Sequence, residues 1–162
     1  MRAVVLGVGN ILLSDEGVGV RAVERFLELY EVPEGVAVID GGTSGMDLLD
    51  ALSGVDLLVV ADAVQAGRPP GTVLTIAGAD VPVFFRNKLS PHQVSLSDVL
   101  ANLEFIDAAP KETVIVGVQP TSLATHLGLT EAVKGRLPQV VQRMAEALQA
   151  RGVVLKHRVL SG

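Results

Sequence analysis

Acidic side chains follow three of the predicted strands at the point where each strand ends. Glu16, next to Asp15, comes soon after the first strand; Asp40 closes the second strand and Asp62 the third. In open α/β sheets, ligands bind beyond the carboxyl ends of the parallel strands. Carboxylates crowded at such an edge repel one another unless a cation or a proton relieves the repulsion. The sequence therefore predicts a cation-accepting site at this edge of the sheet.

A histidine completes the set of possible ligands. His92 lies in the long segment that follows Asp62, shortly before a predicted helix. Together with Glu16 and Asp62 it supplies two oxygen ligands and one nitrogen ligand, which suit a borderline divalent metal such as nickel, zinc or iron. We therefore take Glu16, Asp62 and His92 as the candidate metal ligands.

Each of these residues also has a purely structural interpretation. Ser14 or Asp15 can cap the following helix, whose dipole Glu16 would complement. Asp40 and Asp62 can simply terminate strands, because Asp is common in turns. A lone histidine is more often an exposed loop residue than a ligand. Turn chemistry does not readily explain acids at three successive strand ends, which favours the site.

The glycines near the strand ends also have two interpretations. Gly7-x-Gly9 after the first strand resembles a dinucleotide-binding turn, but Leu12 stands where the third glycine of that motif belongs. Gly41-Gly42 can form a tight turn or let another backbone approach closely. The sequence disfavours the dinucleotide site and leaves both roles of Gly41-Gly42 open.

Composition excludes several classes of function. The 162 residues contain no cysteine, which rules out disulfides, thiolate metal sites and a cysteine nucleophile. The net charge of −5 argues against nucleic acid or an anionic membrane as the main partner. No apolar run reaches the ~18 residues of a membrane span, and no cleavage site follows the apolar N-terminus. We expect a cytoplasmic protein with one domain spanning residues 1–162, without membrane insertion.

Strand and helix patterns alternate along the chain. The predicted strands are residues 2–6, 36–39, 55–61, 72–76 and 113–118, with helices near 17–30, 48–52, after 95 and after 130. Pro69 and Pro70 leave no room for a crossover helix before residues 72–76, so that strand should run antiparallel. Residues 77–94 are expected to be irregular, and Ser95-x-x-Asp98 to begin a helix. The predicted fold is a three-layer α/β/α sandwich with a mixed, mostly parallel five-stranded sheet and one antiparallel strand.

The motifs at the predicted strand ends resemble those of the hydrogenase maturation proteases, endopeptidases that trim the C-terminal extension of the large subunit of [NiFe] hydrogenases. They occur in the family's order over roughly residues 4 to 120. The matching segments are Gly7-Val8-Gly9-Asn10, Asp15-Glu16-Gly17-Val18-Gly19, Asp40-Gly41-Gly42-Thr43 with Gly45, Asp62-Ala63 followed by Pro70-Gly71, Ser90-Pro91-His92-Gln93, and Gly117-Val118-Gln119-Pro120.

The resemblance implies a nickel-sensing protease whose partner is the precursor of a [NiFe] hydrogenase large subunit. Glu16, Asp62 and His92 would contact a nickel ion that the precursor carries, so the isolated protein should bind metal weakly. The resemblance also implicates the segment Asp40-Gly41-Gly42-Thr43 in substrate processing. Either the nickel polarises the scissile region or a carboxylate activates water, for which Asp40 is the best candidate beside Glu16 and Asp62.

Two other classes remain open. A metallopeptidase or amidohydrolase with its own bound ion would use the same ligands, and so would a nickel-binding chaperone that leaves the precursor uncut. Phe84-Phe85 could pack on the precursor or anchor a half-buried loop. His157 is expected in a solvated tail, and neither it nor His126 is assigned a role.

Overall fold

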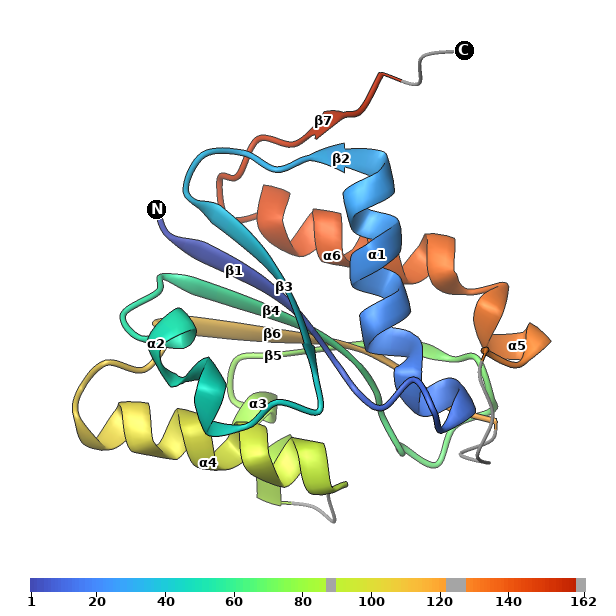
Figure 1. Ribbon diagram of the computed structural model, residues 1–162, viewed down its shortest axis with the longest axis horizontal. Coiled ribbons are helices and arrows are strands. Elements are labelled where there is room, and N and C mark those ends of the chain that lie inside the picture. Colours follow the sequence, from blue (N-terminus) through green and yellow to red (C-terminus); the bar gives the residue numbers. More distant parts are fainter. Residues whose placement is uncertain (87–89, 122–127, 160–162) are drawn as a thin grey trace.

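Five strands form the central sheet, in the order β3-β1-β4-β6-β5. The computed structural model describes residues 1–86, 90–121 and 128–159 (Figure 1). The strands are β1 (Ala3–Val8), β3 (Val36–Gly42), β4 (Leu57–Ala63), β6 (Glu112–Val118) and β5 (Val73–Ala77). Within this sheet only β5 runs antiparallel to its neighbour, because the short segment between β4 and β5 holds no crossover helix. The predicted sandwich with a mixed sheet is confirmed.

Helices cover both faces of the sheet (Figure 1). One face carries α1 (Val18–Leu29), α5 (Glu131–Lys134) and α6 (Leu137–Gln149), and the other carries α2 (Leu49–Leu52), α3 (Asp80–Arg86) and α4 (Pro91–Phe105). Two short 3₁₀ helices, η1 (Ser14–Gly17) and η2 (Met46–Leu48), precede α1 and α2. Every residue of β1 and β4 is buried, as expected for parallel strands covered on both sides. No helix in the described ranges is long and apolar enough to cross a membrane.

Glycines let α1 pack directly on the sheet backbone. A Cβ atom on Gly19 would lie 2.0 Å from the Ala61 carbonyl oxygen, and one on Gly7 would lie 2.4 Å from the Gly19 carbonyl oxygen. A Cβ atom on Gly9 would lie only 1.9 Å from the Glu16 carbonyl oxygen. The Gly-x-Gly segment at the end of β1 therefore serves close packing, and it brings η1 to the carboxyl ends of β1 and β4.

Residues 77–94 depart from the sequence prediction. They are not irregular throughout: α3 occupies residues 80–86, and α4 begins at Pro91 rather than at Ser95. Ser90 caps α4 in a capping box with Gln93, and Pro91 suits the first turn because its missing N–H needs no partner there. The prediction was wrong because Ser95-x-x-Asp98 has the same capping pattern as Ser90-x-x-Gln93 but lies inside the helix.

Two aromatic regions were also left open by the sequence. Phe84 and Phe85 lie on α3, half-buried against the core on that face of the sheet, with ring centroids 5.1 Å apart. This anchors α3 without testing a contact with a partner protein. His157 is exposed, as expected, and it lies in β7 (Lys156–His157), which pairs with β2 (Tyr30–Glu31) and brings its ring against that of Tyr30. His126 lies outside the described residues.

Candidate active site

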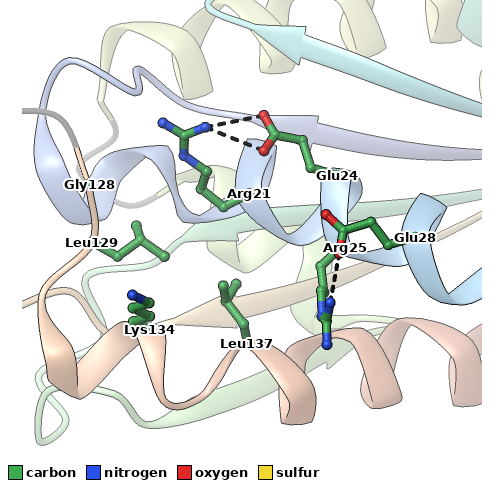
Figure 2. Close-up of a pocket in the computed structure, with 8 residues that line it drawn as sticks. All are labelled: Arg21, Glu24, Arg25, Glu28, Gly128, Leu129, Lys134 and Leu137. Carbon is green, nitrogen blue, oxygen red and sulfur yellow. Dashed lines mark hydrogen bonds and ion pairs between the residues drawn. The ribbon is translucent and has the colours of Figure 1, made fainter. Parts of the chain in front are cut away.

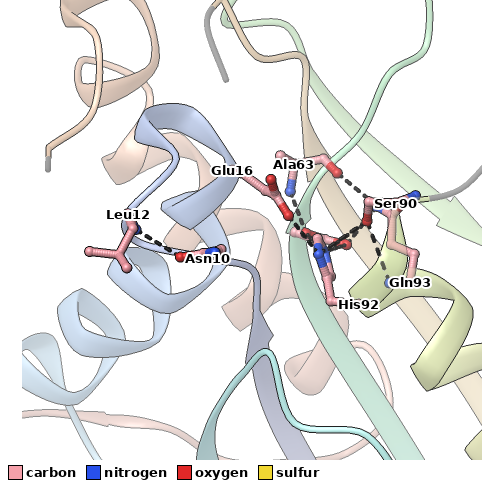
Figure 3. A network of polar contacts seen from close by, with 8 residues as sticks. Asn10, Leu12, Glu16, Ala63, Ser90, His92 and Gln93 are labelled. Carbon is pink, nitrogen blue, oxygen red and sulfur yellow. Dashed lines mark hydrogen bonds and ion pairs between the residues drawn. The ribbon is translucent and has the colours of Figure 1, made fainter. Parts of the chain in front are cut away.

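Three side chains from separate segments meet at the carboxyl end of β4. The ring of His92 lies between two carboxylates: its Nδ1 is 2.8 Å from Glu16 Oε1, and its Nε2 is 3.0 Å from Asp62 Oδ1 (Figure 3). Glu16 comes from η1, Asp62 from β4 and His92 from the first turn of α4. The structure thus brings together the three residues that the sequence singled out as candidate ligands.

The Asp62 carboxylate is held from three sides. Its Oδ1 accepts a hydrogen bond from the Ala63 N–H at 2.8 Å, and its Oδ2 accepts one from Gln93 Nε2 at 2.7 Å. His92 Nε2 lies within 3.1 Å of both oxygens. Because every donor has a fixed direction, the carboxylate has one orientation and Asp62 is more than the end of a strand.

Burial and charge act in opposite directions on these groups. Removal from water lowers the pKa of His92, but the hydrogen bonds and charges of Asp62 and Glu16 outweigh it, so the pKa of His92 is raised. Burial raises the pKa of Asp62 by more than the contacts with His92, Gln93 and the Ala63 N–H lower it. Both shifts favour keeping a proton in the cluster. A protonated imidazole donates from both nitrogens at once, which matches one carboxylate at each nitrogen.

The Ser-Pro-His-Gln segment positions the site as a unit. The Ser90 hydroxyl accepts from the Gln93 N–H and also lies 3.0 Å from His92 Nδ1. The Gln93 side chain uses both of its donors and its acceptor oxygen: the oxygen accepts from the Ser90 N–H, and the amide donates to Asp62 and to the Ala63 carbonyl. Sequence reasoning missed this role of Gln93, because its partner Asp62 lies 31 residues away.

Asp15 has a different role from its neighbour Glu16. It is fully buried, and its carboxylate accepts hydrogen bonds from the Thr121 N–H, the Thr130 N–H and the Thr130 hydroxyl, at 2.8, 2.8 and 2.9 Å. It therefore fastens η1 to the segments that follow β6 and precede α5. The suggested helix-capping role is wrong, because neither η1 nor α1 has a side-chain hydrogen bond at its N-cap.

One cavity adjoins the cluster, and a second cavity shares lining residues with the first. Glu16 and His92 line a cavity of about 210 Å³, together with Asn10, Leu13, Thr43, Pro91 and Ser95. Asn10 and Thr43 also line a second cavity of about 370 Å³, whose wall includes Asp40, Gly42, Gly9, Ile11, Leu12 and Val20. Asp40 is exposed there, and none of the hydrogen bonds and ion pairs of Glu16, Asp62 and His92 reaches it. The four acids thus lie at one edge of the sheet but do not form one site.

Gly41 and Gly42 differ in the space that surrounds them. A Cβ atom on Gly41 would meet Leu6 Cδ1 at 2.8 Å, so Gly41 serves packing against β1. Gly42 has a φ of +49°, which favours glycine, and its carbonyl accepts a hydrogen bond from the Gly9 N–H at 2.7 Å. A Cβ atom on Gly42 would approach only Asp40 Oδ1, at 3.7 Å, so the space beside Gly42 is open.

The cluster is not a closed metal cage. Within the described part of the chain, no three His, Asp or Glu side chains are placed to hold one ion. The two carboxylates lie at opposite nitrogens of His92, and Asp62 does not line either cavity. An ion entering from the cavity could bind His92 only after one of its hydrogen bonds to a carboxylate opens, with loss of a proton.

A third cavity lies away from these side chains, between α1 and the α5–α6 region (Figure 2). Its charged residues pair along α1, with Arg21 Nη1 3.3 Å from Glu24 Oε1 and Arg25 Nη1 2.6 Å from Glu28 Oε2. The remaining lining includes Leu129 and Leu137. Its acidic side chains are thus paired with neighbouring arginines on the same helix.

The chain matches the family model for hydrogenase maturation proteases over residues 20–147. It is 45% identical to the hydrogenase 2 maturation protease of Escherichia coli K12 over 154 residues, which are 94% of each chain. Its fold matches the E. coli hydrogenase maturating endopeptidase HybD with a TM-score of 0.93 and 44% identity, covering 98% of both chains. The [NiFe] hydrogenase maturation protease HybD of Thermococcus kodakarensis matches with a TM-score of 0.74 and 26% identity, over 91% of this chain and 99% of the other. The chain therefore belongs to the hydrogenase maturation protease family and is an endopeptidase.

Proposed function

We propose that this endopeptidase removes the C-terminal extension of a [NiFe] hydrogenase large-subunit precursor after nickel has been inserted. The nickel is part of the substrate, and Glu16, Asp62 and His92 recognise it. The observation that supports this most directly is the buried His92 between two carboxylates, beside a cavity that opens next to Glu16. The names of the most similar relatives, which include a hydrogenase 2 maturation protease, support the substrate class.

Recognition of the loaded precursor would follow from exchange of a proton for a metal ion. The cluster holds a proton between the His92 ring and the carboxylates, so an ion that contacts the ring must displace it. A precursor without nickel carries no ion that could displace this proton, so the hydrogen bonds of the cluster would stay intact. This gives loaded and unloaded precursor different affinities, which is the requirement for selective processing.

Cleavage itself would take place in the neighbouring cavity. Asp40 is exposed beside Gly42 and Thr43, where a peptide backbone can approach because Gly42 has no side chain. Asp40 is our candidate for activating the attacking water, with Gly41, Gly42 and Thr43 contacting the substrate. Polarisation of the scissile region by the nickel, with Glu16 and Asp62 sharing its charge, is the alternative chemistry. We place this reaction in the cytoplasm.

A processing assay tests the proposal. Large-subunit precursor with and without nickel is incubated with the purified protein, and the change in precursor mass is measured. We expect loss of the C-terminal extension only from the nickel-loaded precursor. Cleavage of both forms would contradict nickel recognition, and an unchanged mass with bound nickel would indicate a chaperone. Hydrolysis of small peptides by the zinc-reconstituted protein alone would indicate a metallopeptidase with its own ion.

A further inference from the structure

One edge of the sheet carries backbone groups that no other strand uses. Within residues 1–86, 90–121 and 128–159, β3 pairs with β1 alone. The Ala3 N–H donates to the Gly35 carbonyl at 2.9 Å, in a register that pairs Ala3 with Val36. In a parallel pair, alternate residues bond to the neighbour. The backbone N–H and carbonyl groups of Ala37 and Ile39 therefore face β1. Those of Val36, Val38 and Asp40 face outward, away from the sheet.

Most of these outward groups have no protein partner. The Val36 N–H donates to the Pro33 carbonyl at 3.2 Å. The Val36 carbonyl, and both backbone groups of Val38 and Asp40, form no hydrogen bond with any residue that the structure describes. The helices lie above and below the sheet rather than beyond β3 (Figure 1). The result is an open row of donors and acceptors with a spacing of two residues.

The row lacks the usual protection of an edge strand. Such edges are commonly blocked by Lys, by Pro, or by a bulge that twists the strand away. Residues 36–40 contain neither Lys nor Pro, and the register stays regular until the pairs beyond Gly7–Asp40. The edge can therefore accept an added strand over its whole length.

The open edge leads into the candidate active site. β3 ends at Gly42, and Asp40 and Gly42 line the cavity that shares Asn10 and Thr43 with the cavity beside His92. The other edge strand, β5, is separated from β4 by β6 and runs in the opposite direction. An extended segment on β3 would thus pass directly to Asp40, whereas one on β5 would not.

We propose that the C-terminal extension of the precursor binds as an additional strand on the outer edge of β3, along Val36–Asp40. This inference rests on the proposed function and specifies how the substrate is held. Main-chain hydrogen bonds would provide the affinity, so the extension needs an extended backbone more than a particular sequence. A second copy of this chain is a less suitable occupant, because it would cover the approach to the cavity beside Asp40.

The first test removes one outward donor. Val38→Pro deletes the Val38 N–H, and proline is tolerated where an edge strand faces solvent. With nickel-loaded precursor as substrate, we expect KM to rise about tenfold, the equivalent of about 1.4 kcal/mol, with kcat within about twofold of the wild type. Ala37→Ser is the control, because its backbone faces β1 and its exposed side chain changes little; its KM should match that of the wild type.

The second test needs no substitution. Amide hydrogen exchange of the wild-type protein is followed by NMR during a short pulse, with and without saturating nickel-loaded precursor. We expect the Val38 and Asp40 amides to exchange rapidly in the free protein and at least about tenfold more slowly with precursor, since only these two would gain hydrogen bonds. Ala37 and Ile39 should already be protected. This measurement decides the question if Val38→Pro does not fold.

The outcomes separate this inference from the proposed function. If the wild type processes loaded precursor while Val38→Pro retains its KM, or the Val38 and Asp40 amides gain no protection, edge binding is overturned and nickel-dependent processing stands. If the wild type is a dimer in light scattering and Val38→Pro is a monomer, the edge binds a second copy and the inference is also overturned. If the wild type processes no precursor, the proposed function itself fails.

Discussion

Charged side chains are used in two contrasting ways at the two ends of the η1–α1 segment. At its start, Glu16 contacts His92, whose other nitrogen contacts Asp62, and the side chains of His92 and Asp62 are each 3% exposed. Farther along, Arg21 pairs with Glu24 and Arg25 with Glu28, and the two glutamates are 50% and 62% exposed. The first group joins three distant segments, whereas the second joins neighbours on one helix.

The difference shows which charged side chains of this protein should be sensitive to substitution. Exposed pairs gain little, because water screens them and long side chains lose freedom in making them. A buried group must instead be fully paired, because an unpaired charge away from water is costly. A substitution of any member of the buried cluster, or of a residue that orients one, should therefore have a large effect. Substitution of the exposed pairs on α1 should have little effect. The following substitutions test this difference, from a member of the buried cluster to an exposed pair on α1.

The largest effect is expected at Asp62. Asp62→Asn keeps the shape but replaces one acceptor oxygen with an NH2 donor, which would face another donor because three N–H groups point at this carboxylate. We expect nickel-dependent processing to fall at least ~100-fold, consistent with loss of a ligand and its hydrogen bonds. The rate of precursor cleavage measures this. Asp50→Asn, an exposed acid on α2, is the matched control, and equal rates for both variants would contradict the role of Asp62.

Gln93 should come next. Gln93→Leu removes the amide that orients Asp62 and leaves the Ser90 N–H and the Ala63 carbonyl without their side-chain partner. Residues that hydrogen-bond to metal ligands and orient them typically contribute 10–100-fold, so we expect processing to fall by about that factor. Gln142→Leu on the exposed face of α6 is the control. Restoration of full activity in Gln93→Leu by added nickel would show that Gln93 affects loading of the precursor instead.

Asp15 should affect stability more than processing. Asp15→Ala leaves the Thr121 and Thr130 N–H groups unpaired, which costs about 1–3 kcal/mol in the free energy of unfolding. Urea denaturation measures that loss. Thr130→Val removes only the hydroxyl donor and should cost about 1 kcal/mol or less. If the two substitutions have strictly additive effects, Asp15 and Thr130 are not coupled as the contacts indicate.

The smallest effect is expected on α1. The double substitution Arg25→Ala/Glu28→Ala removes an exposed pair, so the free energy of unfolding should change by less than about 0.5 kcal/mol. Processing should be unchanged, and added salt should make little difference to the comparison with the wild type. A large loss of activity would mean that the groove beside α1 takes part in binding the precursor, which the structure gives no reason to expect.

Much of the fold and part of the site could be predicted from the sequence. The buried strands were recognisable because their apolar runs are continuous, and Pro69 and Pro70 revealed the antiparallel strand. Glu16 and Asp62 were found because they follow strands whose ends share one edge. The start of α4 was misplaced because two capping patterns lie five residues apart, and only packing decides between them.

The remaining features depend on contacts that local patterns do not encode. Asp15 is bonded to Thr130, 115 residues away, and Gln93 to Asp62, 31 residues away. A sequence shows these residue types but not which partner each one reaches. The separation of Asp40 from the His92 cluster has the same origin, since it depends on which way each strand end turns after leaving the sheet.

The close approach at Gly9 has a consequence for how the site can vary. Because the main chain of Glu16 touches Gly9 with no intervening side chain, η1 lies directly against the end of β1, which fixes the point from which the Glu16 side chain extends. Even a methyl group at Gly9 would force the Glu16 backbone to move, and the carboxylate that contacts His92 would move with it. The geometry of the cluster thus depends on a residue that contributes no side chain to it.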